Sequence, residues 1–206
     1  MSRYQASRGH GAGHIARILI VIRDATSDDI DEVTELWGML AQHHEEISDQ
    51  FALAWDSKRR WANYLEQKFS EISTKLIVAE ENGKIVGFML CLLSPNIPVY
   101  KERKVGVISD VYVLEKRRRK GVAKNMLNVA VKWFKKNKVK SIQLGVAHDN
   151  FEARAVWRRM GFEPYMIYKR LDLTRLDEER ALPKRVRKIV RRKKVKKRRG
   201  LQRTRA

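Results

Sequence analysis

Cysteine and long apolar runs are scarce in this chain. Its 206 residues contain one cysteine, Cys91, which excludes an internal disulfide and favours a reducing compartment such as the cytoplasm. The apolar run at residues 18–22 is followed at once by Arg23 and Asp24, and it is too short for a secretory signal or a membrane span. We therefore expect a soluble, cytoplasmic protein without a membrane partner.

Acidic residues are few compared with basic ones. The chain has 45 Lys and Arg against 24 Asp and Glu, a formal net charge of +21. Residues 184–205 contain 14 of the basic residues and no acidic one, so two thirds of the net charge lies in a C-terminal tail. The length allows one good hydrophobic core. We expect a disordered leader at 1–15, one domain at 16–173 and a basic extension at 174–206.

Hydrophobic periodicity predicts helices and strands throughout this domain. Thr26 and Asp29 form a capping-box pattern that opens the first helix, and Asn82-Gly83 is the signature of a two-residue hairpin turn. The expected elements are a strand at 17–23, helices at 26–40 and 61–72, strands at 76–80, 85–93 and 105–114, a helix at 121–137, a strand at 141–146, a helix at 150–160 and a strand at 165–171. This is the order β-α-α-β-β-β-α-β-α-β, an α/β fold.

A basic, glycine-containing segment lies between the strand at 105–114 and the helix that follows it. Its sequence is Arg118-Arg119-Lys120-Gly121-Val122-Ala123. Glycine lets the backbone turn sharply, and the first N–H groups of a helix have no intrahelical partner. These donors, the helix dipole and the flanking cations together predict a phosphate-binding site.

Two signatures together resemble the GCN5-related N-acetyltransferase family over roughly residues 19–173. The first is the segment just described, which is similar to the family pattern Q/R-x-x-G-x-G/A. The second runs from Asn150 to Phe162 and is similar to N-x-x-A-x-x-x-Y-x-x-x-G-F, with Trp157 where tyrosine is usual. The resemblance implies the element order given above, a mixed, mostly antiparallel sheet flanked by helices, and an N-acetyltransferase that uses acetyl-CoA without a metal.

The resemblance also implies which residues hold the cofactor. The pyrophosphate of acetyl-CoA would lie at the first signature, and a bulge in the central strand would open a slot for its pantetheine arm. A backbone N–H of Val111 or Val113 would polarise the thioester carbonyl. The cofactor residues expected in this way are Val111, Val113, Arg118, Arg119, Gly121, Val122, Ala123, Lys124, Asn150 and Trp157. Asn150 can equally be a plain helix N-cap.

Deprotonation of the acceptor amine calls for a base, because an amine of pKa near 10 is protonated at neutral pH. Several family members carry a glutamate on the central strand for this role. Here Ser109 matches that position, and Asp110 is the nearest carboxylate, so Asp110 is our candidate base. It can instead be a carboxylate satisfied by neighbouring backbone donors. By strand alternation, Asp110 shares a face with Ile108 and Tyr112, opposite Val111 and Val113.

Trp157 stands where the family often has a tyrosine that protonates the leaving thiolate. An indole N–H donates a hydrogen bond but does not ionise usefully, so Trp157 cannot serve as a conventional acid. Water, another tyrosine such as Tyr112 or Tyr168, or no acid at all is left for that role, and Tyr112 is our second catalytic candidate. A covalent role for Cys91 and a metal site at His43 and His44 are the weaker alternatives.

The acceptor side and the partners remain open at this stage. The resemblance implies that the region of the first two helices walls the acceptor pocket. This wall would have a negative field suited to a cationic amine, on a small molecule or a protein, from Glu45, Glu46, Asp49 and Asp56. The alternative function is a nucleic-acid- or ribosome-binding protein that uses the fold as a scaffold, with residues 184–205 contacting RNA, DNA or the ribosome. The oligomeric state is open, a dimer included.

The tail supports a direct prediction. Truncation after Leu182 should leave acetyl-CoA binding unchanged and remove most of the affinity for RNA, because the removed lysines and arginines neutralise phosphates and release counterions. For the full chain, log affinity should fall with log salt by about 0.7 to 0.9 for each phosphate contacted. Binding isotherms at several salt concentrations test this. An unchanged RNA affinity and salt slope in the truncated protein would rule out the tail as the binding element.

Overall fold

The computed structural model describes residues 19–173 of the chain. They belong to two compact units, and the division between them falls after Phe162. The leader and the basic tail expected from the sequence lie outside the described residues. The expected domain boundaries stay predictions.

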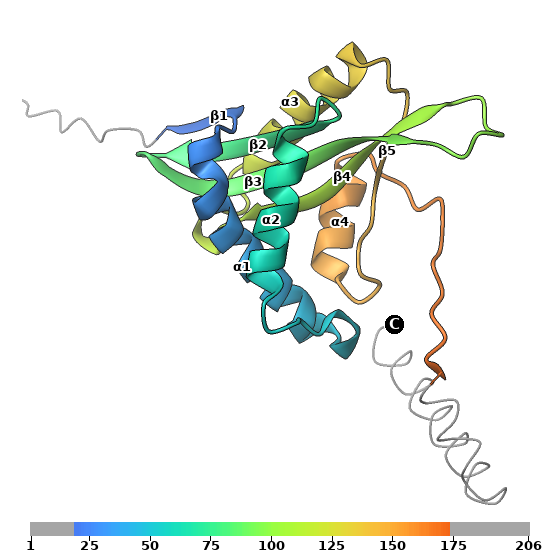
Figure 1. Cartoon of the computed structure of the whole chain (residues 1–206), viewed down its shortest axis with the longest axis horizontal. Coiled ribbons are helices and arrows are strands. Elements are labelled where there is room, and N and C mark those ends of the chain that lie inside the picture. Colours follow the sequence, from blue (N-terminus) through green and yellow to red (C-terminus); the bar gives the residue numbers. More distant parts are fainter. Residues whose placement is uncertain (1–18, 174–206) are drawn as a thin grey trace, which may run out of the picture. The chain divides into compact units, whose positions relative to one another are not determined.

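The first unit contains the sheet and all of the long helices that are described (Figure 1). The capping box at Thr26 and Asp29 is present, and Asn82 and Gly83 both have positive φ, as the hairpin prediction requires. The elements are β1 (Ile20–Asp24), α1 (Ile30–Ile47), α2 (Ser57–Phe69), β2 (Thr74–Glu81), β3 (Lys84–Pro95), β4 (Lys104–Val113), α3 (Val122–Lys136), β5 (Ile142–Leu144) and α4 (Phe151–Arg159), with short 3-10 helices η1 (Ser27–Asp29), η2 (Asp49–Phe51) and η3 (Glu115–Arg117).

The five strands form one sheet in the order β1-β2-β3-β4-β5. The first four strands pair antiparallel, whereas β5 pairs parallel to β4. The predicted fold class, a mixed and mostly antiparallel sheet with flanking helices, is therefore confirmed. The helix between β4 and β5 is the crossover that a parallel pair needs.

Helices cover both faces of this sheet and give two apolar cores. Figure 1 shows α1 and α2 in front of β2 and β3, with α3 partly hidden behind them. On the side of α1 and α2, Val33, Leu65 and Phe88 are completely buried. On the side of α3, Met126 and Ala130 are completely buried and Trp157 of α4 joins the same cluster. The sheet is thus held as the middle layer of three.

A β-bulge interrupts β4 at Ser109. Leu90 pairs with Asp110 while its neighbour Cys91 pairs with Ile108, so Ser109 is an extra residue on β4. One extra residue reverses the alternation of side chains. Ile108 therefore packs on the α3 side, whereas Tyr112 packs on the side of α1 and α2. Our expectation that Ile108 shares a face with Asp110 and Tyr112 is wrong for this reason.

The last strand expected from the sequence, at 165–171, is absent. The described part of the second unit, residues 163–173, is irregular apart from its last residue, and Tyr168 is 89% exposed. Alternating apolar residues form a strand only when a neighbouring strand takes up their backbone groups. β5 pairs over three residues with β4, and no described strand pairs with its other edge. Among residues 19–173, no helix is both long and apolar enough to cross a bilayer.

An ion-pair network fixes the start of α1 against the sheet. Arg23 of β1 donates to Asp29 at 2.6 and 2.8 Å and to Glu80 of β2 at 2.7 Å. The hydrogen bonds from Arg23, followed by the Thr26 N–H, lower the pKa of Asp29 from 3.8 to about 2. A depressed carboxylate pKa stabilises the fold above the unfolded value and this contribution is lost as the pH falls through the folded value.

We predict that Asp29→Asn destabilises the protein at pH 7 by about 2 kcal/mol, the cost of losing a charged hydrogen-bond network that is mostly buried. The wild type should lose stability steadily between pH 4 and pH 2, and the variant should lose less over that range. Thermal unfolding followed by circular dichroism measures both. Asp28→Asn is the control, because Asp28 is exposed and forms no ion pair among the described residues. Equal pH profiles for wild type and Asp29→Asn would refute the assignment.

Candidate functional site

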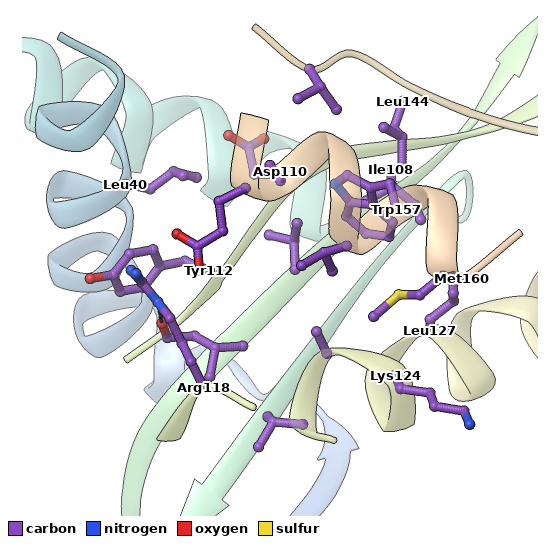
Figure 2. Close-up of a pocket in the computed structure, with 18 of the residues that line it drawn as sticks. Leu40, Ile108, Asp110, Tyr112, Arg118, Lys124, Leu127, Leu144, Trp157 and Met160 are labelled. Carbon is purple, nitrogen blue, oxygen red and sulfur yellow. Dashed lines mark hydrogen bonds between the residues drawn. The ribbon is translucent and has the colours of Figure 1, made fainter. Parts of the chain in front are cut away.

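A cleft of about 680 Å³ opens where β4 and β5 separate. The two strands pair from Gly106 to Ile108 on β4, and the pairing ends there although β4 continues to Val113. Figure 2 shows side chains from β4, α1, α3 and α4 converging on this space. All twelve site candidates from the sequence line it: Asp110, Val111, Tyr112, Val113, Arg118, Arg119, Gly121, Val122, Ala123, Lys124, Asn150 and Trp157. The role of each stays a prediction.

The separation leaves backbone groups of β4 facing the cleft. The N–H of Leu114 donates to Val86 of the neighbouring strand β3 at 2.9 Å. Because successive N–H groups along a strand point to opposite sides, those of Val113 and Val111 point away from β3, toward the gap left by β5. The Val113 carbonyl, on the same side, accepts a hydrogen bond from Arg118 Nε at 3.1 Å. A ligand in the cleft therefore meets strand N–H donors.

A left-handed turn leads into α3 at one end of the cleft. Gly121 is the N-cap with a φ of 80°, and Arg119, two residues earlier, has a φ of 61°. A Cβ at Gly121 would meet no atom within 4 Å, so the space above this residue is open to a ligand. The N–H groups of the first turn of α3 have no carbonyl partner within the helix. The geometry is that of an anion-binding helix start.

The arginine and lysine side chains near the start of α3 differ in whether they are already bound to other groups. Arg117 is bound to Glu81, which is 9% exposed, through hydrogen bonds of 2.7 Å from Nε. Arg118 lies with its guanidinium 5.6 Å from the centre of the Tyr112 ring, and the two side chains lie together in Figure 2. Arg119 and Lys124 line the cleft, are exposed and have no ion-pair partner among residues 19–173. These two remain free to meet an anion.

Asp110 lies at the other end of the cleft, on the side of α1 and α2. Its Oδ1 accepts from Trp37 Nε1 at 3.2 Å and its Oδ2 accepts from the Ser109 hydroxyl at 2.6 Å. Burial raises the pKa of Asp110, and the two hydrogen bonds and the nearby His44 partly offset this rise. The alternative that backbone donors satisfy this carboxylate is not what the structure shows, since both donors are side chains.

Two tryptophans fix the donor to Asp110. Trp37 of α1 stacks on Trp61 of α2 with ring centroids 4.9 Å apart and an interplanar angle of 12°. Trp61 is buried and its other neighbour is Phe88 of β3, at 5.9 Å. The indole N–H of Trp37 is thus held by aromatic contacts that join α1, α2 and β3. These contacts fix the donor of the hydrogen bond that Asp110 accepts.

His44, which the sequence suggested only as a weak metal ligand, lies in the same part of the cleft. It is on α1, four residues after Leu40, and both residues line the cleft. Burial lowers the pKa of His44, the neighbouring His43 lowers it further, and Asp110 acts in the opposite direction. Within residues 19–173, no group of three or more His, Cys, Asp or Glu side chains could hold a metal ion.

Trp157 and Asn150 bring α4 to the cleft. Trp157 is 8% exposed and meets the ring of Phe162 edge-on at 5.2 Å. Figure 2 places its indole beside Ile108 and Leu144, where β4 and β5 part. The Asn150 side chain accepts from the Ala153 N–H at 2.9 Å, so it caps α4 whether or not it also contacts a ligand.

Several other candidates are placed elsewhere or are already engaged. Asp56 is buried and bound to Arg59 and Arg60, so it does not add negative field to the cleft. Cys91 is completely buried, and burial raises its pKa to about 12, which makes a thiolate nucleophile unavailable. Glu45 accepts a hydrogen bond from the Leu53 N–H.

No sequence pattern indicated Trp37 as a partner of Asp110. These residues are 73 positions apart, and the indole looked like one more apolar residue on the buried face of the first helix. His44 was visible as a titratable residue near the acceptor side, but its link to Asp110 comes from the packing of α1 against β4. Such pairings between distant segments leave no local pattern.

The family model described as "Acetyltransferase (GNAT) family" matches residues 40–162, more than half of the chain and all of the cleft. An uncharacterized N-acetyltransferase of Methanocaldococcus jannaschii is 28% identical over 149 residues, which are 72% of this chain and 62% of that protein. The N-acetyltransferase YhfO of Bacillus subtilis is 25% identical over 143 residues, 69% of this chain and 89% of that one. This chain thus spans less than two thirds of the first relative.

A solved structure supports the fold. The predicted acetyltransferase of Clostridium acetobutylicum, determined with acetyl-CoA, matches with a TM-score of 0.62 at 21% identity, covering 76% of this chain and 98% of that one. The resemblance drawn from the two sequence signatures is confirmed by the family model. The chain belongs to the acetyltransferase (GNAT) family, a family of acetyl-CoA-dependent acetyltransferases.

Proposed function

We propose that this chain transfers the acetyl group of acetyl-CoA to a primary amine. The observation that carries the proposal is the cleft itself, which has anion-binding donors at the start of α3, strand N–H donors along β4 and a carboxylate, Asp110, at its far end. Acetyl transfer to an amine needs a group for each of three tasks: holding the phosphates, polarising the carbonyl and removing a proton from the amine.

Cofactor binding would begin at α3. The N–H groups of the first turn, from Val122 to Lys124, would hold the pyrophosphate, with Arg119 and Lys124 adding positive charge. The pantetheine arm would follow the gap between β4 and β5 and donate and accept backbone hydrogen bonds there. The residues around Ile108 and Leu144 give this gap apolar walls.

Carbonyl polarisation would come from the N–H groups of Val111 and Val113. A strand N–H is fixed before the substrate arrives, so it stabilises the developing oxyanion without a reorganisation cost. Asp110 precedes Val111 directly, and the bulge at Ser109 turns its side chain toward α1. The amine would therefore approach from the side of α1 and α2, where Asp110 assists its deprotonation.

The departing sulfur has no strong acid within this arrangement. Trp157 lies in the cleft wall, but an indole does not ionise usefully, and no described residue accepts a hydrogen bond from its N–H. Tyr112 lines the cleft with Arg118 over its ring, and it is the tyrosine of this cleft that could donate a proton. A coenzyme A thiolate is a stable enough leaving group for water to suffice.

The experiment for the overall proposal is thiol release from acetyl-CoA with a panel of peptides, polyamines and aminoglycosides as acceptors. A rise in free thiol with at least one amine, together with the acetylated product by mass spectrometry, is the expected result. Since Cys91 is buried, the protein adds little background to a thiol reagent. Tight acetyl-CoA binding without thiol release for any amine would contradict acetyl transfer.

We predict that Gly121→Val weakens CoA binding at least 10-fold in calorimetry, because a branched side chain would occupy the open space above the turn. The substitution also strains a residue of positive φ by about 1–2 kcal/mol. Gly83→Val is the matched control, since Gly83 has a φ of 74°, is equally open and lies in the β2–β3 turn. Both variants should lose similar stability. Unchanged CoA affinity in a folded Gly121→Val protein would exclude this phosphate site.

We predict that Asp110→Asn lowers turnover about 10²-fold or more, because assistance to amine deprotonation is worth that much. Trp157→Phe should have a mild effect, and Trp157→Tyr should equal or exceed the wild type, because tyrosine can donate a proton to sulfur. Steady-state rates across pH 5 to 9 are the measurement. A wild-type pH–rate profile in Asp110→Asn would remove Asp110 from the mechanism.

A further inference from the structure

The imidazole of His44 is a second titratable group on the Asp110 side of the cleft. It lines the cleft on the side of Asp110, and its ring lies 5.6 Å from that of Phe51 in the α1–α2 connection. Its ring nitrogens have no hydrogen-bond partner among residues 19–173. His43, the preceding residue, differs in that its Nδ1 lies 4.0 Å from Glu46 Oε2, on the same helix.

Asp110 offers the acceptor amine no carboxylate oxygen that is without a hydrogen bond. Each carboxylate oxygen already accepts a hydrogen bond, one from Trp37 Nε1 and one from the Ser109 hydroxyl. These hydrogen bonds favour the charged form of the carboxylate and offset part of the rise in its pKa that burial causes. The Trp37 donor is held in place by its stack on Trp61, so the carboxylate is held in position as well. A fixed anion stabilises a neighbouring cation.

We propose that His44 is the group that takes the proton from the acceptor amine, and that Asp110 is a positioning residue whose negative charge stabilises the imidazolium that results. This inference rests on the proposed acetyl transfer. It assigns a catalytic role to α1, which the two sequence signatures do not include.

The acceptor enters as an ammonium ion and loses one proton to neutral His44 as its nitrogen lone pair forms a bond to the thioester carbonyl carbon. The C–S bond then breaks, the sulfur takes the bonding pair, and the nitrogen loses its second proton to the sulfur directly or through water. The products are an amide and the free thiol of CoA, and His44 returns its proton to solvent.

The protonation state of His44 suits this step. Burial lowers its pKa, His43 on the same helix lowers it further, and Asp110 on β4 raises it. The net change is downward, so the imidazole is mostly neutral at pH 7 and can accept a proton. Glu152 of α4 also lines the cleft, and Phe51 is the uncharged ring that contacts His44 from the α1–α2 connection.

The first test is the pH dependence of kcat/KM with an amine found active in the thiol-release panel. For wild type, kcat/KM should fall on the acid side with a midpoint below 6.5, the ordinary histidine value. His44→Gln should lower kcat about 10²- to 10⁴-fold and remove this acid limb. Asp110→Asn should keep the limb but move it to lower pH, because the charge that raises the pKa of His44 is gone.

His148→Gln is the matched control. His148 is exposed, lies after β5 and does not line the cleft, so this variant should keep the wild-type rate and profile. Added imidazole should partly restore turnover in His44→Ala and have no effect on Asp110→Asn. A purely structural role for His44 would give no such rescue.

A second measurement works without any acceptor. Proton NMR of the His44 ring should give a pKa below 6.5 in the wild type and a lower one in Asp110→Asn, with CoA affinity in His44→Gln unchanged by calorimetry. If the wild type is active, an acid limb that survives in His44→Gln would overturn this inference but not the proposed acetyl transfer. A His44 pKa that is the same in the wild type and in Asp110→Asn would do the same. A wild type that binds acetyl-CoA but acetylates no amine would overturn the proposed function and this inference with it.

Discussion

β4 pairs with β3 along nearly its whole length but with β5 along only part of it, and the site depends on this difference. On one side β4 stays paired with β3 as far as Val113, and on the other side its pairing with β5 ends at Ile108. Backbone N–H and C=O groups need partners wherever they are buried. Beyond Ile108 these groups face the cleft, so the sheet itself supplies directional donors to a ligand. Continued pairing of β5 with β4 beyond Ile108 would close the cleft without changing any side chain that lines it.

The bulge at Ser109 sets which side chains meet which end of the cleft. If the side chains alternated without a break from Ile108 through Ser109, Asp110 would share the face of Ile108 and project toward α3 and the apolar cluster there. With the bulge, Asp110 projects toward α1, where Trp37 and His44 lie. The same shift keeps the N–H groups of Val111 and Val113 directed into the gap. Charge is then divided along the cleft, with free cations at the start of α3 and the carboxylate and imidazole near α1.

Local signals in the sequence predicted much of this fold, because their causes are local. The capping box at Thr26 and the Asn82-Gly83 turn need only neighbouring residues, and both are present. The glycine that precedes α3 was also recognisable, since a left-handed turn before a helix favours glycine. Of these features, the glycine lies in the cleft, at the end where we propose that the phosphates bind.

The end of the cleft near α1 depends on contacts that no local pattern records. A bulge inserts one residue into an otherwise ordinary alternation, so the face assigned to Ile108 was wrong. The apolar alternation at 165–171 predicted a strand that the structure does not contain, because alternation by itself does not supply the partner that a strand needs. The contact of Trp37 with Asp110 joins segments that fold together only after α1 packs on the sheet.

The proposed acetyl-CoA site can be tested by following backbone amide chemical shifts as CoA and then acetyl-CoA are added to the full chain. CoA should shift the amides of the first turn of α3, from Val122 to Lys124, and the acetyl group should add shifts at Val111 and Val113. Shifts confined to other parts of the sheet, or none at β4 on adding the acetyl group, would show that the separated strands do not form the acetyl-CoA site.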